Sequence, residues 1–453
     1  MSDKKTIFED HAITAVPENV RRSFTSMFLT YTGVIVCVAV LWTGGELGQG
    51  LDFNSFWVAV IIGSLISGII GLLTGTVGGF TRVTTYLILR HPFGRLGSKI
   101  AGAAVSGIGC GIGWFTIQAW LFAVVIQTIS LELWGTVPTI FYGPVAAVWG
   151  AALMTLTALL GFKGISFLSY LTIPLFVVIL SGGSFAAITE AGGFSAIPEA
   201  VPAEPMTIPV AITAIVGSYI AGATITSDIS RFSIVPTHGG WAWFWHIMLF
   251  QPILYAMAGM LTMLTPGTDV AQAMAYLGIG VGALFIVIMG QWTTNDSNLY
   301  NGALAFSNTF KLSKPVITVI MGAIGAVLAS LTAMGVFGAD PFISFLVLLG
   351  TWLPPLAGIV IADFYIVKPL MMGVKDPSKR YIFGPGTEYS NINWIGIISW
   401  AVAGLFAYLV PVGIGALNSI VVAFVLFLIL TYVADKLNIQ CTTGKCTESE
   451  SGF

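Results

Sequence analysis

Long apolar runs recur along almost the whole chain, and they restrict its possible folds more than any other feature of the sequence. A helix needs about 20 apolar residues to cross a bilayer, so we predict an all-α polytopic membrane protein with twelve spans. These cover residues 24–49, 54–79, 100–130, 140–162, 165–187, 208–232, 241–265, 274–298, 315–337, 341–362, 392–413 and 416–435. Only 8% of the residues are charged, against about 25% in a typical soluble domain, which excludes a soluble fold.

The basic residues predict how these spans are oriented. If the N-terminus lies in the cytosol and the chain alternates between sides, all 18 lysines and arginines fall in cytosolic segments. The outer segments then carry only acidic residues, namely Glu46, Asp52, Glu132, Glu190, Glu199, Glu204, Asp269 and Asp340. A wrong number of spans would have placed basic residues on both sides. We therefore expect a protein of the cytoplasmic membrane with both ends in the cytosol.

The same assignment divides the chain into three parts. Residues 1–22 are polar and charged, and predict a cytosolic tail without a signal peptide. Residues 23–435 form one transmembrane domain, and residues 436–453 form a second cytosolic tail. Within the domain, we expect residues 81–99 to form a connector along the inner membrane surface and residues 266–276 to form a short outer surface helix.

Two of the expected spans contain sequences that interrupt a helix. Residues 24–49 include Gly33 and a later Thr-Gly-Gly run, and residues 208–232 include the Gly- and Thr-rich stretch 216–228. They are the first and the sixth spans, five positions apart in the order, so the second runs opposite to the first. Interrupted helices at matching positions are typical of inverted repeats with the substrate site at the breaks. Backbone groups freed there can bind an ion and a ligand.

The eighth span ends in an unusual concentration of polar groups. Thr293, Thr294 and Asp296 follow the apolar run 274–289, and a surface facing lipid does not tolerate them. Oxygen-rich side chains near a loosened helix suit a hard cation such as Na⁺. Read alone, the stretch also fits polar contacts between helices, with the hydroxyls bonded to their own backbone.

The third span carries a candidate binding surface. Trp114 and Gln118 are four residues apart and share one face of a helix. The indole offers a flat surface for stacking, and the amide offers donors and acceptors, so the pair suits a planar heterocycle with amide-like edges. The alternative is an interfacial tryptophan and a glutamine bonded between helices. Both residues lie about fifteen positions into the span, which is too deep for a headgroup belt.

The remaining polar residues indicate no catalytic centre. Asp228 and Asp296 could carry protons, although pairing with Arg231 or nearby backbone is the interpretation we favour. Cys441 and Cys446 lack further cysteine or histidine ligands nearby, so a structural metal site is not expected. The histidines are scattered without a nucleophile–base pair, so we expect no enzyme. They are His11, His91, His238 and His246.

Short motifs in a fixed order give the chain a specific resemblance. They are Trp42-Thr-Gly-Gly-Glu-Leu-Gly48, Phe93-Gly-Arg-Leu-Gly-Ser98, Gly113-Trp-Phe115, Val216-Gly-Ser-Tyr-Ile220, Asp228-Ile-Ser-Arg-Phe232, Trp292-Thr-Thr-Asn-Asp296 and Ala362-Asp-Phe-Tyr-Ile-Val367. Over nearly its whole length the chain resembles the nucleobase–cation symporter-1 family, in particular its purine/cytosine permease branch.

The resemblance implies a fold and an activity. The fold is leucine-transporter-like, with inverted repeats at about 24–187 and 208–362 and two additional helices at about 392–435. The activity is uptake of a nucleobase or related small planar N-heterocycle, coupled to Na⁺ or H⁺, of which we expect Na⁺. The coupling ion is then the only cofactor, a monomer suffices, and no nucleic acid is bound.

The resemblance also assigns roles to single residues. Thr293 and Thr294 match the family's sodium-ligating hydroxyls, and Gly290 adds a carbonyl. Trp114 matches the stacking tryptophan, and Tyr219 matches the aromatic residue of span six. The first span adds carbonyls, and the choice among its candidates stays open: they are Gly33, Val36 and Cys37.

Three positions depart from the cytosine permeases. A glutamine, a serine and an asparagine of that branch are replaced here by Gly111, Ala221 and Gly290. Gln118 lies four residues after Trp114, as in the hydantoin, allantoin and uracil branches. A buried polar group that loses its partner costs about 1–3 kcal/mol, so cytosine itself is not the expected substrate.

Two other functions remain possible at this point. One is a transporter of the same fold for another small solute such as an amino acid, although no charge lies near Trp114 or Tyr219 in the sequence. The other is a membrane sensor or channel that binds a ligand without pumping it. Accumulation of solute against a gradient separates a pump from either a sensor or a channel.

Overall fold

The computed structural model describes residues 14–35, 37–160, 163–266, 269–279, 281–310, 312–338, 340–383, 387–410, 412–437 and 445–446. Its elements are η1 (Glu18–Val20), α1 (Phe24–Ile35), α2 (Val38–Gly50), α3 (Phe53–Thr81), α4 (Thr85–Ile88), α5 (Arg90–Gly102), η2 (Ala103–Trp114), α6 (Phe115–Trp134), η3 (Thr139–Phe141), α7 (Gly143–Leu160), α8 (Lys163–Glu190), η4 (Phe194–Glu199), α9 (Ile208–Thr224), α10 (Ser227–Ser230), α11 (His238–Met263), α12 (Val270–Tyr276), α13 (Val281–Phe310), α14 (Lys314–Ala333), α15 (Pro341–Trp352), α16 (Pro354–Ala362), η5 (Asp363–Met371), η6 (Pro377–Lys379), β1 (Thr387–Glu388), α17 (Trp394–Leu409), α18 (Gly415–Lys436) and β2 (Lys445–Cys446). The two short strands pair antiparallel.

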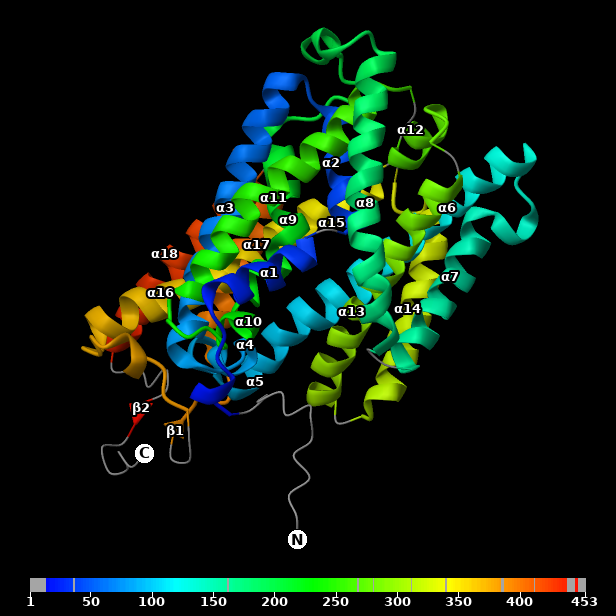
Figure 1. Cartoon of the computed structure of the whole chain (residues 1–453). Helices are drawn as coiled ribbons and strands as arrows, with labels where there is room; N and C mark the ends of the chain where they lie inside the picture. The colour runs from blue at the N-terminus through cyan, green and yellow to red at the C-terminus, as the bar shows by residue number, and fades with distance from the viewer. Residues whose placement is uncertain are drawn as a thin grey trace.

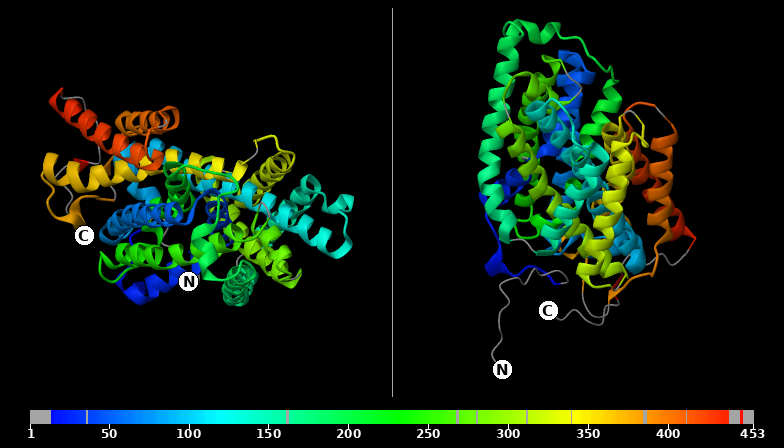
Figure 2. Two further views of the ribbon diagram at one scale, coloured as in Figure 1. Left: turned by 90° about the horizontal axis from the view of Figure 1, so that it is seen from above. Right: turned by 90° about the vertical axis from the view of Figure 1, so that its right-hand side faces the viewer.

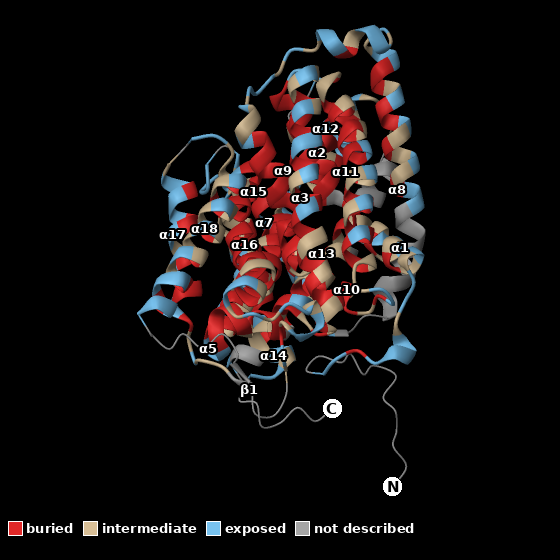
Figure 3. Ribbon diagram, turned by 90° about the vertical axis from the view of Figure 1, so that its left-hand side faces the viewer, coloured by how far each residue is buried: buried red, intermediate tan, exposed pale blue. Residues whose placement is uncertain are grey.

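Helical segments occupy each of the twelve ranges expected from the sequence (Figure 1). In the described part of the chain, seven helical stretches are long and apolar enough to cross a membrane, and three shorter apolar helices accompany them. Buried residues fill the interior of the bundle, whereas exposed ones mark its outer helices (Figure 3). Many exposed side chains are leucine, valine and isoleucine, as a surface facing lipid requires. The chain is a multi-pass helical membrane protein.

The first expected span is broken between α1 and α2. Cys37 has extended backbone angles, φ −140° and ψ 161°, and Val36 lies outside the described residues. The break therefore follows Gly33 by a few residues and avoids the Thr-Gly-Gly run, which lies inside α2. There, a Cβ on Gly44 would lie 2.8 Å from Tyr255 Cα and one on Gly48 2.3 Å from the Gly259 carbonyl. The glycines of α2 thus permit close packing of α11 and do not interrupt the helix.

The sixth expected span breaks near its inner end. Helix α9 ends at Thr224 and the short α10 begins at Ser227. The Thr226 hydroxyl donates to the Gly222 and Ala223 carbonyls, each at 2.9 Å, and competes with regular helical bonding. The Tyr31 hydroxyl of α1 donates to the Thr226 carbonyl at 3.3 Å. The two interrupted spans therefore meet at this second break.

The connector expected along the inner surface is instead buried and helical. Helices α5, η2 and α6 form one rod from Arg90 to Trp134 that is kinked at Gly94 (φ 80°), and Leu87, Ile88 and Phe93 are buried. Main-chain bonds tie the rod to the segment before α17, since Arg95 N–H donates to the Ser390 carbonyl at 2.9 Å. Helix α12 forms as expected, but one side of it is buried against α11, α6 and α2. The connector thus packs against other elements, whereas α12 exposes Gln272 and Tyr276 on its other side, as a surface helix does.

The expected inner and outer segments gather at opposite ends of the bundle. Arg22 and Ser233 form an isolated parallel β-bridge through their main chains. The Arg82 guanidinium donates to the carbonyls of Ser233 and Ile234. At the other end, Glu204 N–H donates to the Gln49 carbonyl at 3.2 Å. Helices α17 and α18 pack together at one edge of the bundle, orange to red in both views of Figure 2. Basic segments therefore share one end, and acidic segments share the other.

Candidate functional site

A cavity of about 1300 Å³ lies between the interrupted spans, the Arg90–Trp134 rod, α11 and α13. Most of the residues expected at the substrate and ion sites line it together. They are Gly33, Cys37, Trp114, Gln118, Tyr219, Ala221, Gly290 and Thr294. Val36 and the side chain of Thr293 lie outside the described residues. Expected residues from four spans far apart in the sequence therefore meet at one cavity.

The third span supplies the flat wall of this cavity. Its helix has wide π-type turns from Ala103 to Trp114, a form common at functional sites. The Trp114 ring is 6% exposed and is held edge-to-face by Phe345 of α15, with ring centroids 5.1 Å apart. Packing therefore fixes the orientation of the indole before any ligand binds.

Gln118 lies one turn further along the same wall and is fully buried. Neither its amide nitrogen nor its amide oxygen has a hydrogen-bond partner in the described part of the protein. Buried polar groups are almost always paired, and leaving one unpaired costs about 1–3 kcal/mol. Gln118 therefore lines the cavity beside a fixed aromatic ring, with an amide whose donors and acceptor are unused.

The sixth span supplies the opposite wall. Tyr219 is 8% exposed, its side chain is hydrogen-bonded to Cys37, and its ring lies 6.2 Å from that of Trp243. Ala221 also lines the cavity, so a side chain at this position contacts whatever occupies it. The hydrogen bond from Tyr219 joins α9 to the break in the first span.

Gly111 has a different location from the other expected substrate residues. A Cβ there would lie 2.6 Å from Gly302 Cα and 2.3 Å from Met321 Cε, at the contact between η2, α13 and α14. It is not among the described residues that line the cavity. The space for a polar side chain at this position is filled by the neighbouring helices.

The candidate cation site is described only in part. Thr294 Oγ1 donates to the Gly290 carbonyl at 3.0 Å, and both residues line the cavity on α13, which contacts α2. The Cys37 carbonyl already accepts from Val40 and Leu41 N–H at the start of α2. The described oxygens are neutral hydroxyl and carbonyl groups on neighbouring turns. The Thr294 hydroxyl is thus bonded to its own helix, as the alternative interpretation of this stretch predicts.

The two intramembrane aspartates have different partners. Asp228 Oδ1 accepts from the Thr85 backbone N–H at 2.7 Å, as pairing with nearby backbone predicts. Asp296 is 1% exposed and accepts from the Thr157 hydroxyl of α7 at 2.9 Å, so the expected pairing with Arg231 or backbone is wrong for this residue. Asp296 lies two residues beyond Thr294, on the face of α13 that turns away from the cavity towards α7.

Several cavity residues were not predicted from the sequence. Trp243 and His246 of α11 line the cavity, as do Ser218 and Tyr31. The Trp243 indole N–H donates to the Ser67 carbonyl at 3.1 Å, and its ring packs edge-to-face on Tyr31 at 5.4 Å. The dense aromatic run 241–246 could have indicated these residues in the sequence. A buried indole in such a run needs a hydrogen-bond partner for its N–H group, which suggests contact with other polar parts of the bundle.

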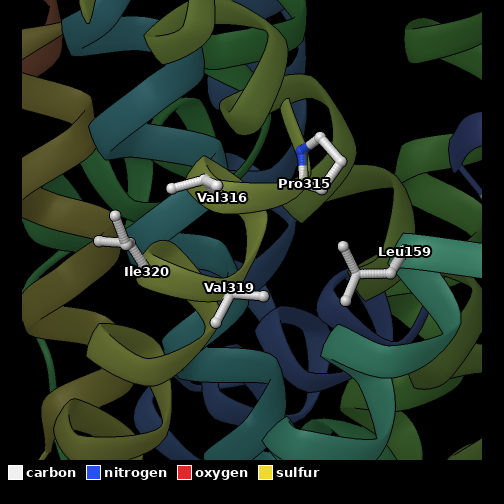
Figure 4. A pocket seen from close by; sticks show the side chains of 5 residues that line it. All are labelled: Leu159, Pro315, Val316, Val319 and Ile320. Carbon is white, nitrogen blue, oxygen red and sulfur yellow. The ribbon is translucent and has the colours of Figure 1, made fainter. Parts of the chain in front are cut away.

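The cavity reaches the basic end of the bundle. Arg95 and Leu96, which are exposed, belong to its lining, whereas no described residue of the acidic outer segments does. A second hollow of about 340 Å³ lies on the outside between α7 and α14. Its side chains are Leu159, Pro315, Val316, Val319 and Ile320 (Figure 4). All five are apolar, so this hollow suits lipid and offers a solute no hydrogen bonds.

The chain matches a family of known proteins. Residues 15–433 match the family described as "Permease for cytosine/purines, uracil, thiamine, allantoin". The chain is 27% identical to the cytosine permease of Escherichia coli K12, over 96% of each protein. It is 24% identical to the hydantoin permease of Microbacterium maritypicum, over 85% of this chain and 81% of the relative.

Solved structures share the fold. The inward-facing conformation of Mhp1 superposes with a TM-score of 0.78 at 19% identity, covering 96% of each chain. A closed conformation of Mhp1, a nucleobase-cation-symport-1 family transporter with bromovinylhydantoin bound, gives a TM-score of 0.71 at 21% identity, over 94% of this chain and 96% of the other.

Proposed function

Since the chain belongs to the family of permeases for cytosine/purines, uracil, thiamine and allantoin, we propose that it is a cation-coupled symporter that imports a small planar N-heterocycle. Its relatives are permeases and not enzymes. The observation that carries the proposal is the buried, unpaired amide of Gln118 at the cavity wall, one turn from the fixed ring of Trp114. A heterocycle with an N–H/C=O edge pairs that amide while it stacks on the indole.

The proposed architecture has twelve spans. Two inverted repeats of five, at about 24–187 and 208–362, enclose the site, and two additional helices at about 392–435 lie outside them. The breaks beside Cys37 and Thr226 lie in the first helix of each repeat, which supports the arrangement. The protein acts as a monomer in the cytoplasmic membrane, with its basic end and both chain ends in the cytosol.

Transport proceeds by alternating access. In this structure the cavity reaches the basic end, so the conformation is the one open to the cytosol. Rocking of one group of helices against the other closes this end and opens the opposite one. The hydrogen bond between Tyr219 and Cys37 joins the two interrupted spans, so they move as one group.

The proposed coupling ion is Na⁺. Thr293, Thr294 and Gly290 of α13 would hold it, together with carbonyls near Gly33, Val36 and Cys37. The ion, when bound, joins the broken first span to α13 and so stabilises the walls that contact the substrate. Ion and substrate therefore bind cooperatively, and the coupling is reciprocal.

A binding screen tests the substrate class. Purified protein is heated with nucleobases, hydantoins or vitamins, each with Na⁺ or with choline at fixed pH, because a ligand that binds only the folded state raises its apparent stability. We expect stabilisation by ligands with an amide-like edge, and more of it in Na⁺. Equal substrate affinity in Na⁺ and choline would refute sodium coupling and favour a proton carrier. Stabilisation by amino acids alone would favour a transporter of another solute.

A transport assay separates a pump from a passive protein. In proteoliposomes with an inward Na⁺ gradient, we expect the labelled heterocycle to accumulate above its outside concentration. Equilibration without accumulation would indicate a channel, and binding without flux would indicate a sensor.

A further inference from the structure

The inner part of the cavity has a chemistry that the proposed substrate does not need. Arginine and lysine side chains line it where it meets the basic end. They are Arg22, Arg90, Arg95, Lys99 and Arg231. Asp228 is the acidic residue of the described lining, and its Oδ1 is bonded to the Thr85 N–H. Within the described chain, no carboxylate lies within ion-pairing distance of Arg90, Arg95 or Lys99.

Topology alone does not explain this arrangement. The positive-inside rule places basic residues in cytosolic segments but does not require them to line the solute pathway. A neutral heterocycle gains nothing from several cations, and a coupling cation is repelled by them. A concave surface with one sign of charge and low-dielectric walls concentrates the opposite charge. The inner cavity therefore suits an anion.

Aromatic rings lie among these cations. The Arg90 guanidinium lies 5.1 Å from the ring centre of Tyr86, and the Arg231 guanidinium lies 4.7 Å from that of Phe232. All four residues line the cavity. Aromatic rings and guanidinium planes are the surfaces on which nucleobases stack, while arginine and lysine bind phosphate. The combination fits a ligand that carries both a planar ring and a phosphate.

This region is separate from the wall formed by Trp114 and Gln118. Lys99 and Trp114 lie fifteen residues apart on this rod, which corresponds to at most about 22 Å along the axis, since the π-type turns from Ala103 rise less per residue than an α-helix. A single mononucleotide is too short to occupy both. The cavity thus has a central region for the transported ring and an inner region, which we call the basic vestibule, defined by Arg22, Arg90, Arg95 and Lys99.

We propose that the basic vestibule binds a cytosolic phosphate ester of a planar N-heterocycle, of the nucleoside monophosphate class, and that such binding inhibits uptake. The proposal rests on the proposed function, since the ligand is the phosphorylated form of the kind of solute that is imported. The vestibule is accessible when the cavity is open to the cytosol. A ligand at ten times its Kd therefore raises the population of that conformation about 11-fold over the others. Import then slows as the phosphorylated product accumulates.

Binding is measured on the purified full-length protein. Cytidine, uridine and adenosine 5′-monophosphates are compared with their nucleosides and with inorganic phosphate by thermal shift and by calorimetry. We expect at least one nucleotide to bind more tightly than its nucleoside and than phosphate, with an affinity that falls as salt rises. The double variant Arg95→Gln/Lys99→Gln should weaken this binding by about tenfold or more, because hydrogen bonds to charged groups are lost. Lys379→Gln, at an exposed inner site outside the cavity lining, should leave it unchanged.

Inhibition is measured in proteoliposomes loaded with the same compounds. We expect the nucleotide inside to reduce initial uptake of the heterocycle, and the double variant to require about tenfold more of it. The proposal would be overturned if the nucleotide inhibited the double variant as strongly as the wild type. It would also be overturned if inorganic phosphate bound as tightly as the nucleotide. So would an effect that follows the phosphatidylglycerol content of the vesicles and not the nucleotide, since the site would then bind lipid headgroups. Heterocycle binding in every sample reports on folding and on the transport site: if it fails in the wild type, the proposed function is wrong, and if it persists without nucleotide binding, only this inference is wrong.

Discussion

Replacing Gln118 with leucine should have opposite effects on stability and on binding. The side chain is fully buried, and neither amide atom has a partner in the described protein. Leucine has a similar volume and no polar atoms, so it removes the cost of the unpaired groups without leaving a cavity. We expect the ligand-free protein to become more stable by about 1–3 kcal/mol.

The same substitution should weaken binding selectively. Ligands with an amide-like edge lose their partner and should bind about 5- to 150-fold more weakly, which corresponds to 1–3 kcal/mol. Analogues without that edge should keep their affinity within about twofold, because specificity arises from buried polar groups left unpaired. Thermal unfolding without ligand and competition for a labelled heterocycle measure the two effects on the same preparation.

A matched variant tests whether the two effects share one cause. Thr116 is on the same helix, is buried with an unpaired hydroxyl, and is not among the described cavity residues. Thr116→Val should therefore stabilise the protein without changing any affinity. A uniform loss of affinity across ligands in Gln118→Leu, or lower stability with unchanged affinity, would refute the assignment of this amide to the substrate.

Substitutions at three further places in the site have defined outcomes. Trp114→Ala removes a stacking surface worth about 1–3 kcal/mol per ring and should weaken all ligands by a similar factor in the same competition assay; a loss confined to one ligand class would contradict stacking. Thr294→Ala, like Thr293→Ala, should raise the Na⁺ concentration needed for half-maximal uptake, and an unchanged Na⁺ dependence would remove these residues from the ion site. Ala221→Ser combined with Gly290→Asn should shift competition towards cytosine, which the wild type should bind weakly; strong cytosine binding by the wild type would contradict this view of the pocket.

The sequence predicted a multi-pass helical membrane protein, and most of the residues expected at the site line one cavity, for physical reasons. A bilayer imposes an apolar length on each span and a charge asymmetry on the connections, and both are properties of composition alone. Trp114 and Gln118 share a helix face by spacing, so their meeting at one cavity required only that this face point inwards. Gly290 and Thr294 are also four residues apart, so they share one face of α13 and line the cavity together.

Features set by contacts between helices could not be read in this way. The break in the first span falls at Cys37, whereas Gly44 and Gly48 permit close contact with α11. Trp243 enters the cavity wall because α11 packs against α3 and α2, which no local pattern specifies. Asp296 finds Thr157, a partner 139 positions away in the sequence. Such pairings follow from the tertiary arrangement and not from the periodicity of any single segment.

The contact between Gly111 and Gly302 constrains how this permease could acquire a different specificity over generations. The resemblance places a glutamine at the position of Gly111 in the cytosine permeases, and a Cβ there would lie 2.6 Å from Gly302 Cα. A lineage starting from this sequence cannot gain that glutamine in one tolerated step, because the helices must first separate. In directed evolution towards cytosine, we expect substitutions in α13 or at Met321 to precede any change at Gly111, because the contact between these helices must open first.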